Sequence, residues 1–80
     1  MLMNLYVIRD RKSGLYIPPF ASINDNTAER DFFALMTRPD YQFTKDDQEL
    51  YSVGSFDSES GVCVTAEAQP RFICQYAEKG

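Results

Sequence analysis

The chain has 80 residues, of which 44% are apolar and 25% are charged, and this composition predicts one globular domain spanning residues 1–80. Its 12 acidic residues outnumber its 8 basic ones, giving a net charge of -4. This balance argues against strong non-specific binding of duplex nucleic acid, which depends on basic side chains. The absence of histidine excludes a Ser-His-Asp triad and a Cys-His nucleophile pair. No glycine-rich phosphate loop is present either, so we expect a non-enzymatic protein without a cofactor.

The first elements form a predicted hairpin. Residues 5–9 are rich in β-branched and aromatic side chains, which predicts a strand. Residues 10–14 predict a turn, because the leading aspartate accepts backbone N–H bonds and the closing glycine tolerates positive φ. A second strand is expected at residues 15–17. It ends at two prolines, which have no N–H to donate to a ladder, and residues 20–25 are expected to form a loop.

One helix is predicted at residues 26–37. Asn26 is a favourable N-cap, and Glu29 follows three residues later as in a capping box. Pro39 is expected to end the helix. Four apolar side chains fall on one helical face: Ala28, Phe32, Leu35 and Met36.

Three further strands are predicted at residues 49–56, 62–65 and 71–76, and Gly54 indicates either a bulge or a close approach of another segment within the first of them. The order along the chain is therefore β-β-α-β-β-β. This order predicts an α+β fold, a small antiparallel sheet of about five strands with one helix packed on one face.

Residues 57–61 repeat the aspartate-to-glycine spacing of the first turn, residues 10–14. The repeat has two explanations, an internal duplication of a hairpin or independent use of a common turn. Cys63 and Cys74 lack metal or redox spacing, and we expect both to be reduced and buried. The alternative is one disulfide across neighbouring strands.

A basic cluster and the strand tyrosines form the candidate binding site. Aromatic side chains on a sheet beside a basic loop can hold single-stranded nucleic acid by stacking and phosphate attraction. The alternative is that the tyrosines, Tyr6, Tyr16, Tyr51 and Tyr76, pack as cross-strand pairs. Arg71 and Arg38 would widen the patch if the fold brings them close. The candidate nucleic-acid-binding residues are Arg9, Arg11, Lys12, Tyr16 and Arg71.

Two acidic clusters are candidate metal or acid–base sites, one at Asp46, Asp47 and Glu49 and one at Asp57 and Glu59. Their spacing does not match an EF-hand, and they fall on predicted turns where solvated carboxylates are usual. We therefore expect no metal site, and a small metal-dependent nuclease is only a minor reading.

The environment of the chain can also be anticipated. Residues 1–8 are apolar but too short to cross a bilayer and lack the features of a signal peptide, so we expect no membrane contact and a cytoplasmic location. Two unpaired sheet edges are expected, and small proteins often cover such edges by dimerising.

Residues 4–65 contain a recognisable set of turn glycines, strand aromatics and helix-start residues. They are Leu5, Tyr6, Ile8, Asp10, Lys12, Gly14, Tyr16, Pro19, Phe20, Asn24, Asp25, Ala28, Arg30, Phe32, Glu49, Leu50, Tyr51, Val53, Gly54, Phe56, Asp57, Ser60 and Gly61. In these residues the sequence resembles the small nonstructural protein of gokushoviruses, which are single-stranded DNA phages.

This resemblance implies a non-capsid protein made in the bacterial cytoplasm that binds DNA or associates with the replication complex. It would act in the switch from duplex replication to single-strand synthesis and packaging. The leading hypothesis is therefore an accessory protein that binds single-stranded DNA, or a phage replication protein, as a small oligomer. The alternative is a protein-interaction module that binds a phage or host protein without contacting DNA.

Overall fold

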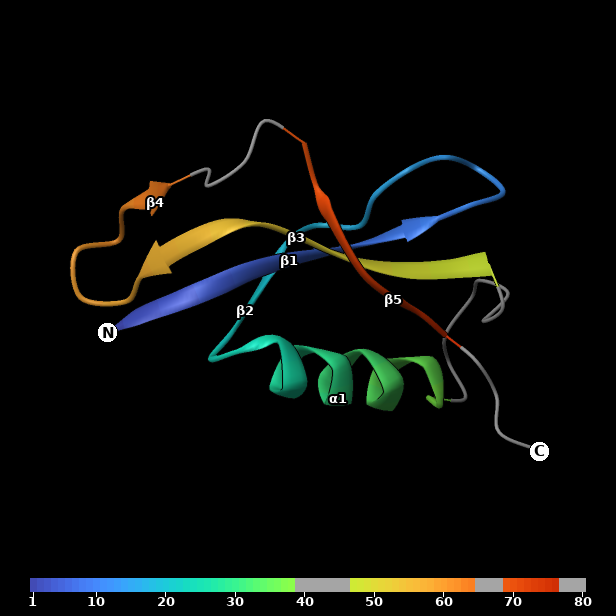
Figure 1. Cartoon of the computed structure of the whole chain (residues 1–80), viewed down its shortest axis with the longest axis horizontal. Coiled ribbons are helices and arrows are strands. Elements are labelled where there is room, and N and C mark those ends of the chain that lie inside the picture. Colours follow the sequence, from blue (N-terminus) through green and yellow to red (C-terminus); the bar gives the residue numbers. More distant parts are fainter. Residues whose placement is uncertain (39–46, 65–68, 77–80) are drawn as a thin grey trace.

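The computed structural model describes residues 1–38, 47–64 and 69–76 (Figure 1). The elements are β1 (Leu2–Asp10), β2 (Phe20–Ser22), α1 (Asp25–Met36), β3 (Gln48–Asp57), β4 (Cys63–Val64) and β5 (Arg71–Gln75). All strand pairs are antiparallel and belong to one sheet. The predicted α+β class, with a small antiparallel sheet and one helix, is confirmed.

The centre of the sheet is the long pair β1 and β3, which run side by side while α1 lies along one side of them (Figure 1). β2 pairs with the free edge of β1. β4 and β5 both pair with the other edge of β3, β4 near its end and β5 near its start. In the β1–β3 ladder, Leu5 lies opposite Gly54 and Tyr6 opposite Ser52, so Val53 is an extra residue. The bulge predicted from Gly54 is therefore confirmed one residue earlier, and it increases the local twist.

The second strand differs from the prediction. Residues 15–17 make only an isolated bridge, between Tyr16 and Arg9, and the strand β2 forms where a loop was expected. The prolines at 18 and 19 explain the error, because they cannot donate to the ladder but do not prevent the chain from returning to it. The last donor before them is the Ile17 N–H, which bonds the Ile8 carbonyl at 2.9 Å.

The first turn (residues 10–14) and the second turn (residues 57–61) have the same backbone bonds. The aspartate carbonyl accepts from the glycine N–H at 2.8 Å in both, and the glycines have φ of 74° and 77°. The aspartate N–H bonds the carbonyl of Leu15 in one turn and of Val62 in the other, at 2.9 and 3.0 Å. Both explanations of the repeat, duplication and common turn chemistry, are compatible with this identity. Because the two turns share these bonds, Leu15 and Val62 occupy equivalent positions.

The start of α1 corrects the predicted cap. Asn24, not Asn26, is the N-cap, and its extended backbone (φ -155°, ψ 176°) begins a helix one residue earlier than predicted. The Thr27 N–H donates to Asn24 Oδ1 at 2.9 Å and the Asn24 N–H donates to Thr27 Oγ1 at 3.1 Å. Thr27 therefore closes the capping box in place of Glu29. The helix ends at Met36 with Thr37 as C-cap, and Pro39 lies outside the described residues.

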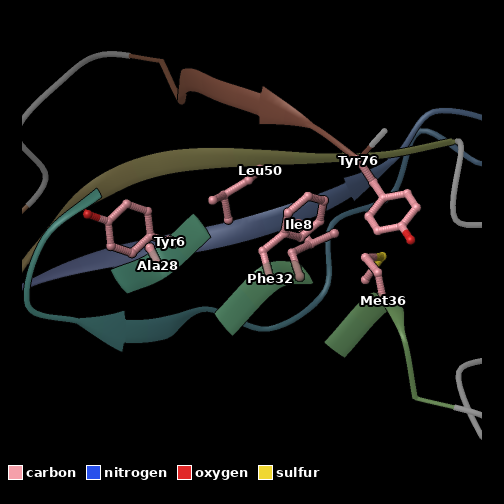
Figure 2. Packing of buried hydrophobic residues seen from close by; sticks show 7 residues of the cluster. All are labelled: Tyr6, Ile8, Ala28, Phe32, Met36, Leu50 and Tyr76. Carbon is pink, nitrogen blue, oxygen red and sulfur yellow. The ribbon is translucent and has the colours of Figure 1, made fainter. Parts of the chain in front are cut away.

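The core lies between α1 and the face of the sheet that the helix covers. Figure 2 shows side chains from β1 and β3 meeting those of the helix, with an aromatic ring from the end of β5 beside them. These residues are Tyr6, Ile8, Ala28, Phe32, Met36, Leu50 and Tyr76. Ala28, Phe32 and Met36 confirm the predicted apolar face of the helix, whereas Leu35 is only half-buried.

A hydrogen-bonded chain fixes one end of this core. The Tyr6 hydroxyl donates to Asp25 Oδ1 at 2.6 Å and accepts from Asn4 Nδ2 at 3.1 Å. Burial, together with the bond to Asp25, raises the pKa of Tyr6 to about 12. The bond connects the middle of β1 to the first turn of α1.

The cysteines are free, and neither is fully buried. Cys63 is exposed, so the prediction that it is buried is wrong, and Cys74 is half-buried. They lie opposite Phe56 and Leu50, six positions apart on β3, which corresponds to about 20 Å. This separation is far beyond the reach of the alternative disulfide.

The capping box makes a clear prediction for stability. Asn24→Ala should lower the free energy of unfolding by about 1 kcal/mol, because one helix N–H loses its partner. Asn26 lies two residues further along the chain and is exposed. Asn26→Ala is therefore the matched control and should change the free energy of unfolding little. Urea denaturation of the two variants checks the assignment, and an equal loss in both would contradict it.

A second prediction concerns alkaline pH. Because the folded pKa of Tyr6 lies near 12, above its ordinary value of 10.0, this group contributes stability that is complete below pH 10 and is lost as pH rises toward 12. In Tyr6→Phe the urea midpoint should therefore fall less between pH 9.5 and pH 11.5 than in the wild type. Parallel decreases in the two proteins would show that Tyr6 does not titrate in this way.

Candidate nucleic-acid interface

The face of the sheet opposite α1, here called the outer face, carries the candidate site. Side chains alternate along a strand, and since Tyr6, Ile8 and Leu50 point into the core, the residues between them point away from it. These are Val7 and Arg9 on β1 and Glu49 and Tyr51 on β3. In the ladder between the two strands, Val7 lies opposite Tyr51 and Arg9 lies opposite Glu49.

Three aromatic rings form a row across the outer face. The Tyr16 and Tyr51 ring centroids are 6.0 Å apart with an interplanar angle of 70°, and those of Tyr51 and Phe72 are 5.6 Å apart at 74°. These edge-to-face contacts are within the favourable range for aromatic pairs. The two outer rings are partly exposed, Tyr16 by 47% and Phe72 by 52%. Val7, on the same face, is buried. The row thus shields the strand beneath it and still presents ring surface to solvent.

A polar pair lies beside the row. Arg9 Nη1 is 3.4 Å from Glu49 Oε1, and the Tyr51 hydroxyl donates to the same oxygen at 3.1 Å. Burial, followed by the bond to Glu49, raises the pKa of Tyr51. Glu49 therefore neutralises Arg9 and orients Tyr51, so Arg9 contributes less positive potential to this face than its sequence position implies.

The first turn supplies the basic charge. Arg11 and Lys12 are exposed, and neither makes an ion pair within the described part of the chain. The turn is anchored against β3, because the Arg11 N–H bonds the Asp47 carbonyl at 2.8 Å and Gln48 Nε2 donates to the buried Asp10 carboxylate at 3.0 Å. Bonds from Ser13 lower the pKa of Asp10, so it stays ionised at neutral pH. The anchored turn thus places these two cations, unpaired among the described residues, at the Tyr16 end of the row.

Arg71 does not join this group. Its guanidinium lies 3.5 Å from Asp25, at the start of α1 on the opposite side of the sheet. Arg9, Arg11, Lys12 and Tyr16 are brought together as anticipated, and Arg71 is separated from them.

Sequence reasoning left two of the three rings out of the binding set. Tyr51 was noted only as a strand tyrosine, and Phe72 was not singled out. Their place in the row depends on the pairing of β5 with β3, where Phe72 lies opposite Tyr51. The four strand tyrosines differ in position, because Tyr6 and Tyr76 are core residues whereas Tyr16 and Tyr51 lie on the outer face and pack edge to face on each other.

The acidic clusters have other partners. Glu49 pairs with Arg9, Asp57 accepts the bonds of the second turn, and Asp46 lies outside the described residues. Among residues 1–38, 47–64 and 69–76, no three metal-ligating side chains gather. Within the same residues, no helix has the length and apolar character needed to span a bilayer.

The described residues thus form a small antiparallel sheet with one helix, and the outer face of the sheet carries an aromatic row beside a basic turn. The family described as Phage ORF5 protein matches residues 3–79, so the chain belongs to this family and is a phage protein, expected to be made in the host cell. Neither the comparison with curated proteins nor that with solved structures finds a match.

The bond between Tyr51 and Glu49 can be tested directly. Glu49→Gln should lower the pKa of Tyr51, because the carboxylate is both its hydrogen-bond acceptor and a nearby negative charge. The fall should be partial, since burial is the larger cause and remains. Tyrosine ring-carbon NMR across an alkaline titration measures it. Glu59→Gln, in the distant second turn, is the control, and an equal change in both variants would contradict the assignment.

Proposed function

We propose that the protein is a non-enzymatic phage accessory protein that binds single-stranded DNA on its outer face. In this proposal it acts in the cytoplasm of the bacterial host, at the switch from duplex replication to single-strand synthesis and packaging. It is the role implied by the resemblance to gokushovirus nonstructural proteins. The observation that carries the proposal is the row of Tyr16, Tyr51 and Phe72 beside Arg11 and Lys12, which are exposed and make no ion pair with the residues that the structure describes.

Each part of the surface has a physical role in this proposal. Unpaired bases stack on exposed ring surface, which is available at Tyr16 and Phe72, and phosphates are attracted to Arg11 and Lys12. Duplex DNA hides its base faces in its own stack and offers mainly phosphates. A protein of net charge -4 would bind it weakly. The arrangement therefore favours single strands.

The small number of cations makes the salt dependence quantitative. If two phosphates are neutralised, the slope of log K against log salt should be about -1.4, from roughly 0.7 per phosphate for single strands. Stacking is insensitive to salt by comparison, so binding should persist as salt rises. A steep slope would instead indicate a wider basic surface than the outer face offers.

A second candidate function is binding of a phage or host protein on the same face without DNA. The net charge of -4 and the half-exposed apolar rings favour it, because aromatic side chains are enriched at protein interfaces. In this case the rings would bury against a protein surface and the salt dependence would follow that partner's charges.

The decisive titration uses a labelled single-stranded oligonucleotide of about 20 nucleotides, followed by fluorescence anisotropy at two salt concentrations and against the matching duplex. Phe72→Leu keeps an apolar side chain but removes the ring, and it should weaken single-strand binding by up to about 1–3 kcal/mol, roughly 5- to 150-fold. Lys12→Ala should weaken it and also reduce the salt slope by about 0.7.

Arg30→Ala is the matched control for charge, because Arg30 is exposed on α1, on the other side of the sheet. It should leave affinity nearly unchanged. Absence of binding at protein concentrations of about 100 µM in low salt would reject the DNA proposal, since even non-specific binders reach about 10⁻⁴–10⁻⁶ M. That outcome would favour the protein-binding candidate.

A further inference from the structure

An apolar groove lies on the helix side of the molecule, away from the outer face. It runs between α1 and the chain leading into β2 and has a volume of about 220 Å³. Its walls and floor are formed by Ile8, Ile17, Pro18, Phe20, Phe32 and Leu35. Ile8 and Phe32, seen together in Figure 2, are fully buried and form the floor. The groove is smaller than the roughly 300–1,000 Å³ of small-molecule sites, and its scale suits one or two apolar side chains.

The chain carries an apolar side chain without a place in its own core, directly beside the groove. Leu15 is 70% exposed, the largest exposed fraction among the large apolar side chains of the described residues. It precedes the groove residues Ile17 and Pro18 by two and three positions. The Leu15 side chain, which can act as a knob, and the groove therefore belong to one surface patch.

We propose that this patch is a homodimer interface in which Leu15 of each copy inserts into the groove of the other. In a two-fold symmetric interface the same patch faces itself, so a knob can meet a groove only if both lie on that patch. The adjacency of Leu15 to Ile17 and Pro18 meets this requirement. The insertion of Leu15 does not depend on DNA binding, because the groove lies on the helix side of the sheet.

Charges at the patch are complementary as well. Asp31 lines the groove, and its carboxylate is half exposed; among the described residues its one ion pair is an exposed contact of 3.5 Å with Arg30. Such exposed pairs contribute little, so Asp31 remains available to a stronger cation. Lys12 is in the same turn as Leu15 and makes no ion pair within the described residues. In the dimer, Lys12 of each copy would approach Asp31 of the other.

The test is the concentration dependence of molecular mass by sedimentation equilibrium, with the full chain and no nucleic acid. The wild type should be a dimer at micromolar concentration. Leu15→Asp should raise the dimer dissociation constant by about tenfold or more, because a charge would enter the apolar groove. Circular dichroism of the same sample should show a folded protein, since Leu15 is exposed in the monomer.

Val62→Asp is the matched control. Val62 is 56% exposed and holds the equivalent position in the second turn, with the same backbone bond to its aspartate, but it is not a groove residue. It should leave dimerisation unchanged, whereas equal effects in the two variants would overturn the proposal.

A charge exchange tests the orientation of the two copies. Lys12→Glu and Asp31→Lys should each weaken the dimer, and the double variant should restore it, because each copy then presents the reversed pair. Failure of the double variant to recover would reject the Lys12–Asp31 contact. A wild type that stays monomeric at several hundred micromolar would overturn the whole proposal and leave the groove to a different protein. The Leu15 and Val62 variants leave the proposed DNA-binding residues intact, so their outcomes do not bear on affinity for single-stranded DNA, whereas Lys12→Glu would also remove a proposed phosphate contact.

Discussion

The structure depends on one constraint, that in the described part of this 80-residue chain the 12-residue helix α1 can cover only one face of the sheet. A small sheet is stable in water only if one face is packed against something, and α1 provides that packing. Strict alternation along β1 and β3 then divides the side chains into two sets. Tyr6, Ile8 and Leu50 enter the core, and their neighbours are directed to the other face.

The outer face consequently presents an aromatic row that is not enclosed, beside the polar pair Arg9 and Glu49. Its three rings protect Val7 by packing edge to face, and half of the surface of the outer two remains in contact with water. Exposed apolar surface of this kind is a common mark of a binding site. The basic turn is fixed next to it by the anchoring of Asp10 and Arg11 to the start of β3. The position of the candidate site thus follows from the same β1–β3 ladder that organises the core.

Local features of the sequence were sufficient to predict much of this fold. The alternation of residues 5–9, the aspartate-to-glycine turns and the apolar face of the helix each depend on neighbours within a few positions. The helix cap shows the limit of that reasoning, because Asn24 and Asn26 are equally good residues. Thr27 determines that Asn24 is the N-cap, because its hydroxyl accepts from the Asn24 N–H and its own N–H donates to the Asn24 side chain. The Thr27 hydroxyl also bonds Ser22 on β2 at 2.6 Å.

The errors in the candidate site have a different origin, which is pairing between distant segments. β2 could not be anticipated because two prolines separate it from the turn, and the chain rejoins β1 after them. Phe72 belongs to the aromatic row, and Arg71 is excluded from the basic patch, only because β5 pairs with β3 in one register. Neighbouring strand residues point to opposite faces. A single-residue difference in that register would have exchanged their positions.

The central claim is that the outer face, and not the helix side, meets the ligand. The most direct measurement is an NMR titration of the labelled protein with a short single-stranded oligonucleotide, following backbone amides and aromatic ring carbons. The account predicts that the largest shift changes occur at Tyr16, Tyr51, Phe72 and the first turn, with α1 little affected. Changes concentrated on α1 and the groove, with the three rings unmoved, would contradict it.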